Sequence, residues 1–388
     1  MKKKNFMSLL LAAATCFSLL AGCSNGGASG NAGANANVIK IGGIGPLTGS
    51  AAQYGIATRQ GAEIAVSEIN ELGGSIQFEL NSQDDEADGE KGVNAYNTLI
   101  DWGMQILYGC TTSGSCAAVA AESFSDRVFQ LTPSASSTTV TEGKDNVFQL
   151  CFTDPNQGKT AADFISEHKL ATKIAVIYNN GDDYSTGIYQ GFAAEAEKVG
   201  LELVSVTTFP DDTTTDFSAQ LTDAQNSGAE LVFLPIYYTP ASNILLQAKQ
   251  KGLSFSYFGC DGLDGILTLE GFDTSLAEGV YVLTPFDTTS DAAVSFIEKY
   301  KEAAGEAPNQ FAADAYDCMY ALYEACQKAN ITSDMSYSDV CDALISVFTS
   351  SDFAVDGLTG SGMQWGANGE VSKDPLVVQI VNGAYVNQ

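Results

Sequence analysis

Three hydroxyl side chains and a glycine follow one apolar segment of the chain, in the order Thr111-Thr112-Ser113-Gly114. The segment before them, Met104–Tyr108, has the composition of a short buried strand, and the Ala-rich stretch after them, Ala117–Ser125, is predicted to be helical. Glycine lets a ligand approach the backbone closely, and the N-terminus of a helix attracts a negative group. The pattern therefore indicates an anion site, although serine and threonine also occur there as plain helix caps.

Groups suited to catalysis or metal binding are sparse in the rest of the sequence. No nucleophile elbow, phosphate-binding loop, zinc-protease motif or Cys-x-x-Cys pair occurs. The single histidine, His168, lies in the charged sequence Glu167-His168-Lys169, which is typical of an exposed helix end. Aspartates are abundant, but no two are spaced for paired acid–base work. We therefore expect a protein with no catalytic residues, no metal and no cofactor; turnover of a bound ligand would instead indicate an enzyme.

The first 22 residues have the pattern of a secretory leader. Lys2–Lys4 precede a short apolar run, Phe6–Leu20, which at roughly 15 residues is too short to span a bilayer. Leu20-Ala21-Gly22-Cys23 follows and resembles a bacterial lipobox. Its small residues leave the backbone open to a peptidase, and the Cys23 thiol can be alkylated by a diacylglyceryl donor. We therefore expect a lipid-anchored mature chain; an ordinary secretory signal with a chance cysteine is the alternative.

Residues 23–37 are expected to be the lipidated cysteine and a flexible tether. Ser24–Asn37 contains only serine, asparagine, glycine and alanine, so it cannot bury a core. Roughly 350 residues follow, enough for two domains, and no later apolar run reaches membrane-spanning length. The formal net charge is −29, and cleavage before Cys23 would remove three lysines and no acid. A chain this acidic repels nucleic acid and anionic lipid, so neither is expected as a partner.

Seven cysteines remain once Cys16 and Cys23 are set aside. An odd number without dense spacing is not a disulfide framework, and it does not match a zinc site. We expect most of them to be small buried apolar residues, with Cys110 and Cys116 as the one pair that could form a bridge. The seven are Cys110, Cys116, Cys151, Cys260, Cys318, Cys326 and Cys341.

Strand-like and helix-like segments alternate along the rest of the chain. Val38–Ile44 is an apolar, β-branched run, and the helical pattern from about Gln53 to Leu72 ends at Gly73-Gly74. The alternation restarts after Asp154-Pro155. It implies an α/β fold with two doubly wound domains, whose parallel sheets are covered by helices on both faces. Further strands are expected at 173–178, 201–206, 231–235, 255–259, 279–283 and 376–381, and further helices at 184–199, 291–304, 311–329 and 338–348.

A series of short motifs runs through nearly the whole chain, from about Ile39 to Gly369. The motifs are Ile41–Gly55 (IGGIGPLTGSAAQYG), Gly61-Ala62-Glu63, Glu68-Ile69-Asn70, Leu131–Ser136 (LTPSAS), Asn156-Gln157-Gly158, Asp182-Asp183-Tyr184, Thr215-Asp216-Phe217-Ser218, Gly259–Gly262 and Phe311–Asp317. In their order and spacing they resemble the type I periplasmic binding proteins for leucine, isoleucine and valine, which are the substrate-binding proteins of ABC transporters. Each motif is only a few residues long, so the resemblance rests on the whole series.

The resemblance implies two doubly wound parallel-sheet lobes joined by three crossover strands, an arrangement known as a Venus-flytrap. Lobe 1 is expected to comprise residues 38–154 plus 285–373, and lobe 2 residues 155–284 plus 374–388. The ligand would lie between the lobes, where strand ends meet helix N-termini. The resemblance also implies an extracytoplasmic monomer that delivers an amino acid to an ABC permease in the membrane.

Three serines of lobe 1 are implied as ligand contacts. Ser113 matches the family's carboxylate-binding serine, in agreement with the anion site inferred above. Ser134 and Ser136 match positions that contact the ligand backbone through their own backbone and hydroxyl groups. Ordinary turn chemistry is the alternative explanation for both of these residues.

One acidic residue and three tyrosines complete the implied site. Asp261 matches an acidic residue, typically glutamate, that holds the ligand ammonium; aspartate is one methylene shorter, which leaves the exact ligand open. Tyr54, Tyr184 and Tyr237 match positions that line the cleft, where aromatic rings shield an ion pair from water. Tyr238, beside Tyr237, is a candidate for shaping the side-chain pocket.

The implied mechanism is closure of two half-sites on a ligand that contacts both. Two other functions fit the same fold: a sensory module that reports ligand occupancy to a signalling partner, and a binder of a different solute such as an amide, urea, a short peptide or an aromatic acid. Asp261 together with Ser113 favours an amino acid, because both ends of a zwitterion then find a partner.

Overall fold

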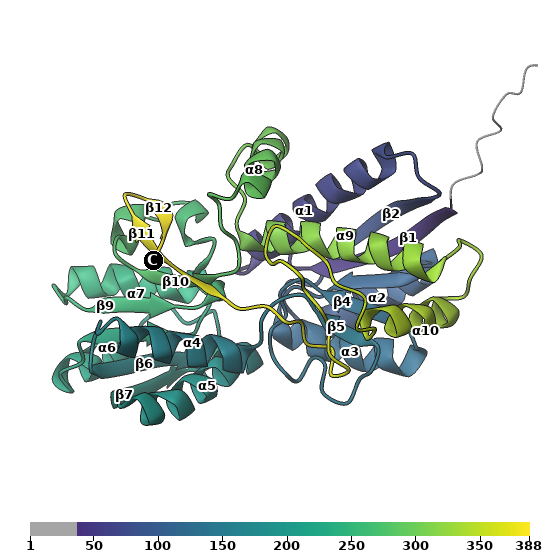
Figure 1. Cartoon of the computed structure of the whole chain (residues 1–388). Coiled ribbons are helices and arrows are strands. Elements are labelled where there is room, and N and C mark those ends of the chain that lie inside the picture. The colour runs from purple at the N-terminus through teal and green to yellow at the C-terminus, as the bar shows by residue number, and fades with distance from the viewer. Residues whose placement is uncertain (1–36) are drawn as a thin grey trace, which may run out of the picture. The chain divides into compact units, whose positions relative to one another are not determined.

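The computed structural model describes residues 37–388. The expected leader, Cys23 and the tether up to residue 36 lie outside the described residues. The described chain folds into two α/β lobes, each built on its own sheet (Figure 1). Among its helices, none combines the length and apolar character needed to cross a membrane.

Lobe 1 is built on a five-stranded sheet in which every pair of neighbours is parallel. Five helices cover it, and the strands alternate their side chains between the two faces. Ile39 and Ile41 join the apolar cluster of α1, α9 and α10, whereas Ile44 joins that of α2 and α3. In spatial order the strands are β2 (Ile76–Asp84), β1 (Asn37–Gly45), β3 (Ile106–Gly109), β4 (Phe129–Thr132) and β5 (Val147–Gln149), and the helices are α1 (Ala52–Glu71), α2 (Gly89–Trp102), α3 (Ser113–Asp126), α9 (Gln310–Ala329) and α10 (Tyr337–Phe348).

Lobe 2 is built on a seven-stranded sheet. Its first five strands are parallel, as the sequence predicts, while β10, β11 and β12 pair antiparallel. Asn382-Gly383 joins β11 to β12, and both residues have positive φ, as a two-residue hairpin requires. In spatial order the strands are β12 (Ala384–Asn387), β11 (Leu376–Val381), β10 (Tyr281–Thr284), β9 (Ser256–Gly259), β8 (Leu231–Leu234), β6 (Lys173–Asn179) and β7 (Glu202–Phe209).

Four helices and three short 3-10 turns accompany this second sheet. The tightest helix pair is α4 with α5, where a side chain at Gly158 would place its Cβ 2.3 Å from the Ile188 carbonyl oxygen. Glycine is therefore required at that crossing. The elements are α4 (Asp154–Glu167), α5 (Asp183–Val199), α6 (Ser218–Asn226), α7 (Tyr238–Gln250), η1 (Asp261–Leu263), η2 (Ile266–Thr268) and η3 (Thr274–Ala277).

The chain passes between the lobes three times, as the predicted fold requires. The passages follow β5, β10 and α10. Helix α8 (Asp291–Ala304) comes directly after the second passage and is held to α1 of lobe 1. Lys299 pairs with Glu68 at 2.5 Å, and the Tyr300 hydroxyl donates to the Gln60 side chain at 2.6 Å. Helix α8 therefore lies against lobe 1 although its sequence follows lobe 2.

A buried ion pair fixes the third passage to lobe 1. The Lys373 ammonium lies 2.5 Å from the Asp314 carboxylate of α9 and donates to the Thr359 hydroxyl at 2.7 Å. Asp317, one turn further along α9, accepts from the Thr359 hydroxyl at 2.6 Å. Both charged side chains of the pair are almost fully buried, at 1% and 3% exposed. Lys373 is therefore the cation that compensates a buried acidic cluster.

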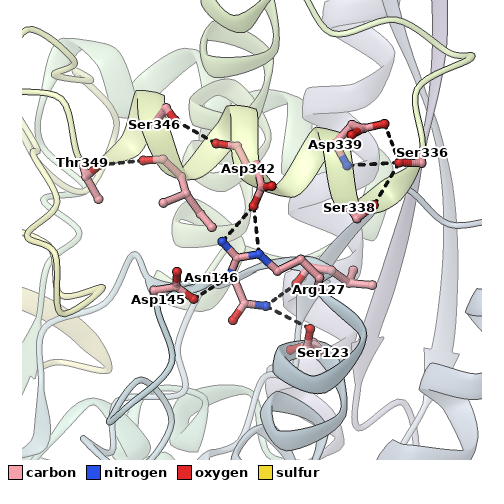
Figure 2. Close-up of polar contacts among 12 residues, drawn as sticks. Ser123, Arg127, Asp145, Asn146, Ser336, Ser338, Asp339, Asp342, Ser346 and Thr349 are labelled. Atoms are coloured by element: carbon pink, nitrogen blue, oxygen red, sulfur yellow. Dashed lines mark hydrogen bonds and ion pairs between the residues drawn. The ribbon is translucent and has the colours of Figure 1, made fainter.

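Arg127 ties the end of α3 to α10 at the surface of lobe 1 (Figure 2). It ends α3 in the left-handed conformation, with φ of 64°. Its guanidinium lies 2.8 Å from Asp342 of α10 and 2.6 Å from Asp145, which leads into β5. Asn146, drawn beside it, donates to the Ser123 carbonyl at 3.0 Å. These contacts hold the short strand β5 against the edge of the sheet.

All seven cysteines of the described chain are buried and free. This agrees with the expected role as small apolar core residues. Cys110 and Cys116, the one pair that the sequence allows to bridge, belong to the same apolar cluster as thiols.

Substituting Lys373 by methionine should destabilise the protein strongly. The Asp314 carboxylate would stay buried without its cation, and losing one partner of a buried pair costs about 3–5 kcal/mol. Urea unfolding followed by circular dichroism measures the change. Lys328→Met is the matched control, because Lys328 pairs with Asp352 at the exposed surface and should cost less than about 1 kcal/mol. Equal losses in the two variants would contradict this account of the third passage.

Candidate functional site

The hydroxyl-rich loop after β3 lies at the carboxyl end of the lobe 1 sheet, as the sequence predicts. Thr112 is the residue before the first turn of α3, so the free N–H groups of that helix end face the same region. The Thr112 hydroxyl is buried and has no hydrogen-bond partner among the described residues, nor does it cap the helix. A buried hydroxyl without a hydrogen-bond partner lowers the stability of the protein, which indicates that a ligand group forms a hydrogen bond with it.

Ser113 and Ser134 lie beside this loop with hydroxyls that already have one protein partner each. The Ser113 Oγ accepts the N–H of Ser137 at 3.1 Å, so its own proton remains free to donate. The Ser134 hydroxyl donates to the Thr111 carbonyl at 2.6 Å, so its lone pairs remain free to accept. Ser113 can therefore donate to an anion, whereas Ser134 can accept from a cation.

Lobe 2 contributes a chain of hydrogen bonds that ends on Asp261. The Gly262 N–H donates to the Tyr184 hydroxyl at 2.9 Å, and this hydroxyl donates to the Asp261 carboxyl at 2.6 Å. Gln157 of α4 accepts the Asp261 N–H at 3.1 Å and so fixes its backbone. All of these groups are buried. The arrangement orients one oxygen of the carboxyl and leaves the other available to a ligand.

Tyr54 of α1 joins the lobes at this point. Its hydroxyl donates to the Gly262 carbonyl at 2.5 Å and accepts the Tyr238 N–H at 3.2 Å. Its ring packs on Phe311, with centroids 4.5 Å apart, and on the edge of Tyr237 at 5.3 Å. Tyr54 therefore forms direct contacts between the lobes as well as part of the wall.

These residues enclose one small cavity. Its volume is about 10 Å³, which is close to the space that one water molecule needs. The tyrosine rings thus fill most of the room in this arrangement of the lobes, and a larger ligand requires them to separate. None of the described residues that line the cavity is a lysine, arginine or histidine. The lining consists of Tyr54, Thr111, Thr112, Ser113, Ser134, Tyr184, Tyr237, Asp261, Gly262 and Phe311.

The structure brings six of the seven expected ligand-binding residues into this lining; the exception is Ser136. Ser136 is fully buried behind the wall, where its hydroxyl accepts a long hydrogen bond of 3.5 Å from Gln157. Its backbone carbonyl accepts the N–H of Asp154 at 3.0 Å. In this arrangement Ser136 supports the site from behind.

Buried carboxyl groups dominate the electrostatics of the site. Burial raises the pKa of Asp261 to about 7, although the hydrogen bond from Tyr184 opposes the shift. Burial also raises the pKa of Asp154 well above its usual range. The Ser136 hydroxyl lies beside Asp154 without a hydrogen bond of good geometry. A cation brought by a ligand would relieve this unfavourable burial.

Several contributors were not singled out from the sequence. Gly262 and Phe311 lie within quoted motifs but were not named as contacts, and Gln157 supports Asp261 from another motif, whereas Thr112 belongs to the predicted hydroxyl-rich loop. The motifs that contain these residues were the only sequence signal for their role. The sequence does not show which of their atoms already form hydrogen bonds, because this depends on tertiary contacts.

Two α/β lobes, three passages between them and a polar cavity at their boundary define a two-lobed solute-binding protein. The family of periplasmic binding proteins matches residues 38–384, and the chain belongs to this family. It is a type I member of the branched-chain amino acid group and is a binding protein rather than an enzyme.

Known relatives cover most of the chain. A Leu/Ile/Val-binding protein homologue of Brucella melitensis is 30% identical, over 76% of this chain and 80% of that protein. The leucine-binding protein LivK of Thermotoga maritima is 25% identical, with a TM-score of 0.80 over 90% of this chain and 97% of that one. The substrate-binding protein LivJ of Streptococcus pneumoniae, solved with isoleucine, is 29% identical, with the same TM-score and coverage.

The raised pKa of Asp261 predicts a specific dependence of stability on pH. The folded protein holds this proton up to about pH 7, whereas the unfolded chain releases it near 3.8. The contribution to stability is therefore fully present below the unfolded pKa and is lost as the pH rises through the folded pKa. Asp261→Asn should make the fall in unfolding free energy between about pH 4 and pH 7 shallower.

Urea unfolding at a series of pH values measures this slope. Asp101→Asn, at an exposed position of α2, is the matched control and should leave the slope unchanged. If Asp261→Asn also leaves it unchanged, the Asp261 carboxyl does not titrate in this range.

Proposed function

We propose that this protein captures an amino acid with a branched-chain or related side chain between its lobes and delivers it to the permease of an ABC importer. One observation carries the proposal. The cavity places the hydroxyls and free helix end of Thr112 and Ser113 on one lobe and the buried Asp261 carboxyl on the other. An α-amino acid has a carboxylate for the first set and an ammonium for the second.

Each lining residue has a distinct role in this proposal. The Ser113 and Thr112 hydroxyls donate to the ligand carboxylate, together with the first N–H groups of α3. Asp261 and the Ser134 lone pairs accept from the ammonium. The rings of Tyr54, Tyr184 and Tyr237 and of Phe311 then contact the side chain and exclude water. Ser136 holds Gln157 and, through it, Asp261.

The ligand named for LivJ, isoleucine, supports an apolar amino acid as the solute. Apolar and aromatic walls suit such a side chain. Asp261 stands where a glutamate is typical, so the ligand ammonium must lie closer to lobe 2 or reach it through water. A non-zwitterionic solute would leave either Asp261 or Thr112 without a partner.

Closure of the lobes is the step that couples capture to transport. Residues 38–154 plus 285–373 would move as lobe 1 against residues 155–284 plus 374–388 as lobe 2. The ligand stabilises the closed form because it contacts both lobes, and the permease recognises that form. The lipobox supports an extracytoplasmic protein anchored through lipid on Cys23, and the family resemblance supports a monomer.

Thermal unfolding of residues 37–388 against the twenty amino acids tests the proposal. A ligand at 100 times its Kd adds about 2.7 kcal/mol of stability, which clearly raises the midpoint. The rise should occur with branched-chain or related amino acids and should be lost in Asp261→Ala and Ser113→Ala. Asp101→Ala, on the outer surface of α2, should keep it.

The protein must first be unfolded and refolded to remove any ligand that co-purifies. If no amino acid then raises the midpoint, the amino-acid assignment is wrong while the fold stands. A rise with an amide or an aromatic acid alone would identify a different solute.

Thr112→Val should separate ligand binding from stability. The Thr112 hydroxyl has no partner in the described protein, so removing it should leave the ligand-free stability unchanged or slightly higher. If the hydroxyl donates to the ligand, its loss should weaken affinity by about tenfold. Calorimetric titration and urea unfolding of the same variant measure both effects. A large loss of stability with unchanged affinity would show that the hydroxyl has only a structural role.

A further inference from the structure

A second and much larger hollow lies at the boundary of the two lobes. Its volume is about 650 Å³, within the range of about 300–1,000 Å³ that is typical of small-molecule sites. Helix α8 and the loop before α9 form one wall, and the segment after η1 and the β11–β12 turn form the other. We name it the α8 groove. Its apolar lining consists of Leu267, Val294, Ile297, Ala307, Pro308 and Ala384.

Two buried polar atoms in the lining lack partners among the described residues. They are Oδ1 of Asp264 and the hydroxyl of Tyr385. Asp264 is only 5% exposed, and its other carboxyl oxygen accepts the Gln310 N–H at 2.8 Å. The Tyr385 hydroxyl lies beside Asp264 without a hydrogen bond of good geometry. The two atoms therefore mark a buried polar point in a groove whose lining also includes Thr268, Thr288, Glu298, Lys301 and Asn309.

The charges around this point determine which ligand it accepts. The charged residues of the lining are Asp264, Glu298 and Lys301, and no ion pair of the described chain involves any of them. A carboxylate ligand would be repelled by Asp264. A primary ammonium carries three donors, enough to reach both Asp264 and Tyr385. Burial also raises the pKa of Asp264, so a cation there relieves an existing desolvation cost.

We propose that the α8 groove is a second binding site, for a small organic amine whose apolar body lies against α8 and whose ammonium contacts Asp264 and Tyr385. The site is independent of the solute assigned to the cavity. It lies close to that cavity all the same: Gln310, which holds Asp264 through its backbone, also donates from its side chain to the Asp261 carbonyl at 3.1 Å. An amine in the groove therefore contacts the same short segment that carries the ammonium partner of the cavity.

Calorimetric titration of residues 37–388 with 2-phenylethylamine tests this site. Binding of the amine should be at least about tenfold tighter than that of 2-phenylethanol, which has the same body without the charge, and 3-phenylpropionate should not bind. Asp264→Asn and Tyr385→Phe should each weaken the amine by about tenfold. Glu270→Gln removes the same charge from an exposed position outside the groove and should leave affinity unchanged.

Three outcomes would overturn the proposal. Equal binding of amine and alcohol would mean that the groove offers only apolar contact. Loss of amine binding in Asp261→Asn but not in Asp264→Asn would place the amine in the cavity instead. Absence of binding at millimolar amine would mean that the groove does not accept an ammonium group. Circular dichroism checks that each variant is folded. If Asp264→Asn does not fold, Tyr385→Phe tests the contact with the ammonium instead.

Discussion

The burial of the Asp261 carboxyl without a cation is the constraint on which the cleft depends. The protein opposes its desolvation with one chain of hydrogen bonds, in which Gly262 donates to Tyr184 and Tyr184 donates to Asp261. Gln157 fixes the same segment from α4. These bonds orient the carboxyl but do not neutralise it, since burial still raises its pKa to about 7. A positively charged ligand group is the missing partner.

The two-sheet architecture explains why partners from distant segments meet around that carboxyl. Thr112 follows β3 and Ser134 follows β4 in lobe 1, while Tyr237 follows β8 and Asp261 follows β9 in lobe 2. Each of these residues lies just beyond the carboxyl end of a parallel strand, where an open α/β sheet leaves room for ligands. Tyr54 and Phe311 are exceptions: they lie in the first turns of α1 and α9, and Tyr54 reaches across the boundary with its hydroxyl.

Most of the fold could be predicted from hydrophobic periodicity, because its strands are buried on both faces and its helices end at clear signals such as Gly200. Strand β5 was missed because it has only three residues, and the exposed edge strand β12 because it has little apolar pattern. Individual site residues could be predicted from the motifs that contain them. The free hydroxyl of Thr112 and the indirect role of Ser136 could not be predicted, because they depend on which neighbouring groups already form hydrogen bonds.

The burial of all seven thiols has a consequence for how the chain reaches its native state. The reactive species of cysteine is the thiolate, and burial raises the pKa of Cys326 and Cys341 to about 12 and also raises that of Cys260. Once folded, these thiols are shielded from oxidants. Because the described native structure contains no disulfide, its formation requires no oxidative folding machinery, and reducing surroundings break no bond of the native structure.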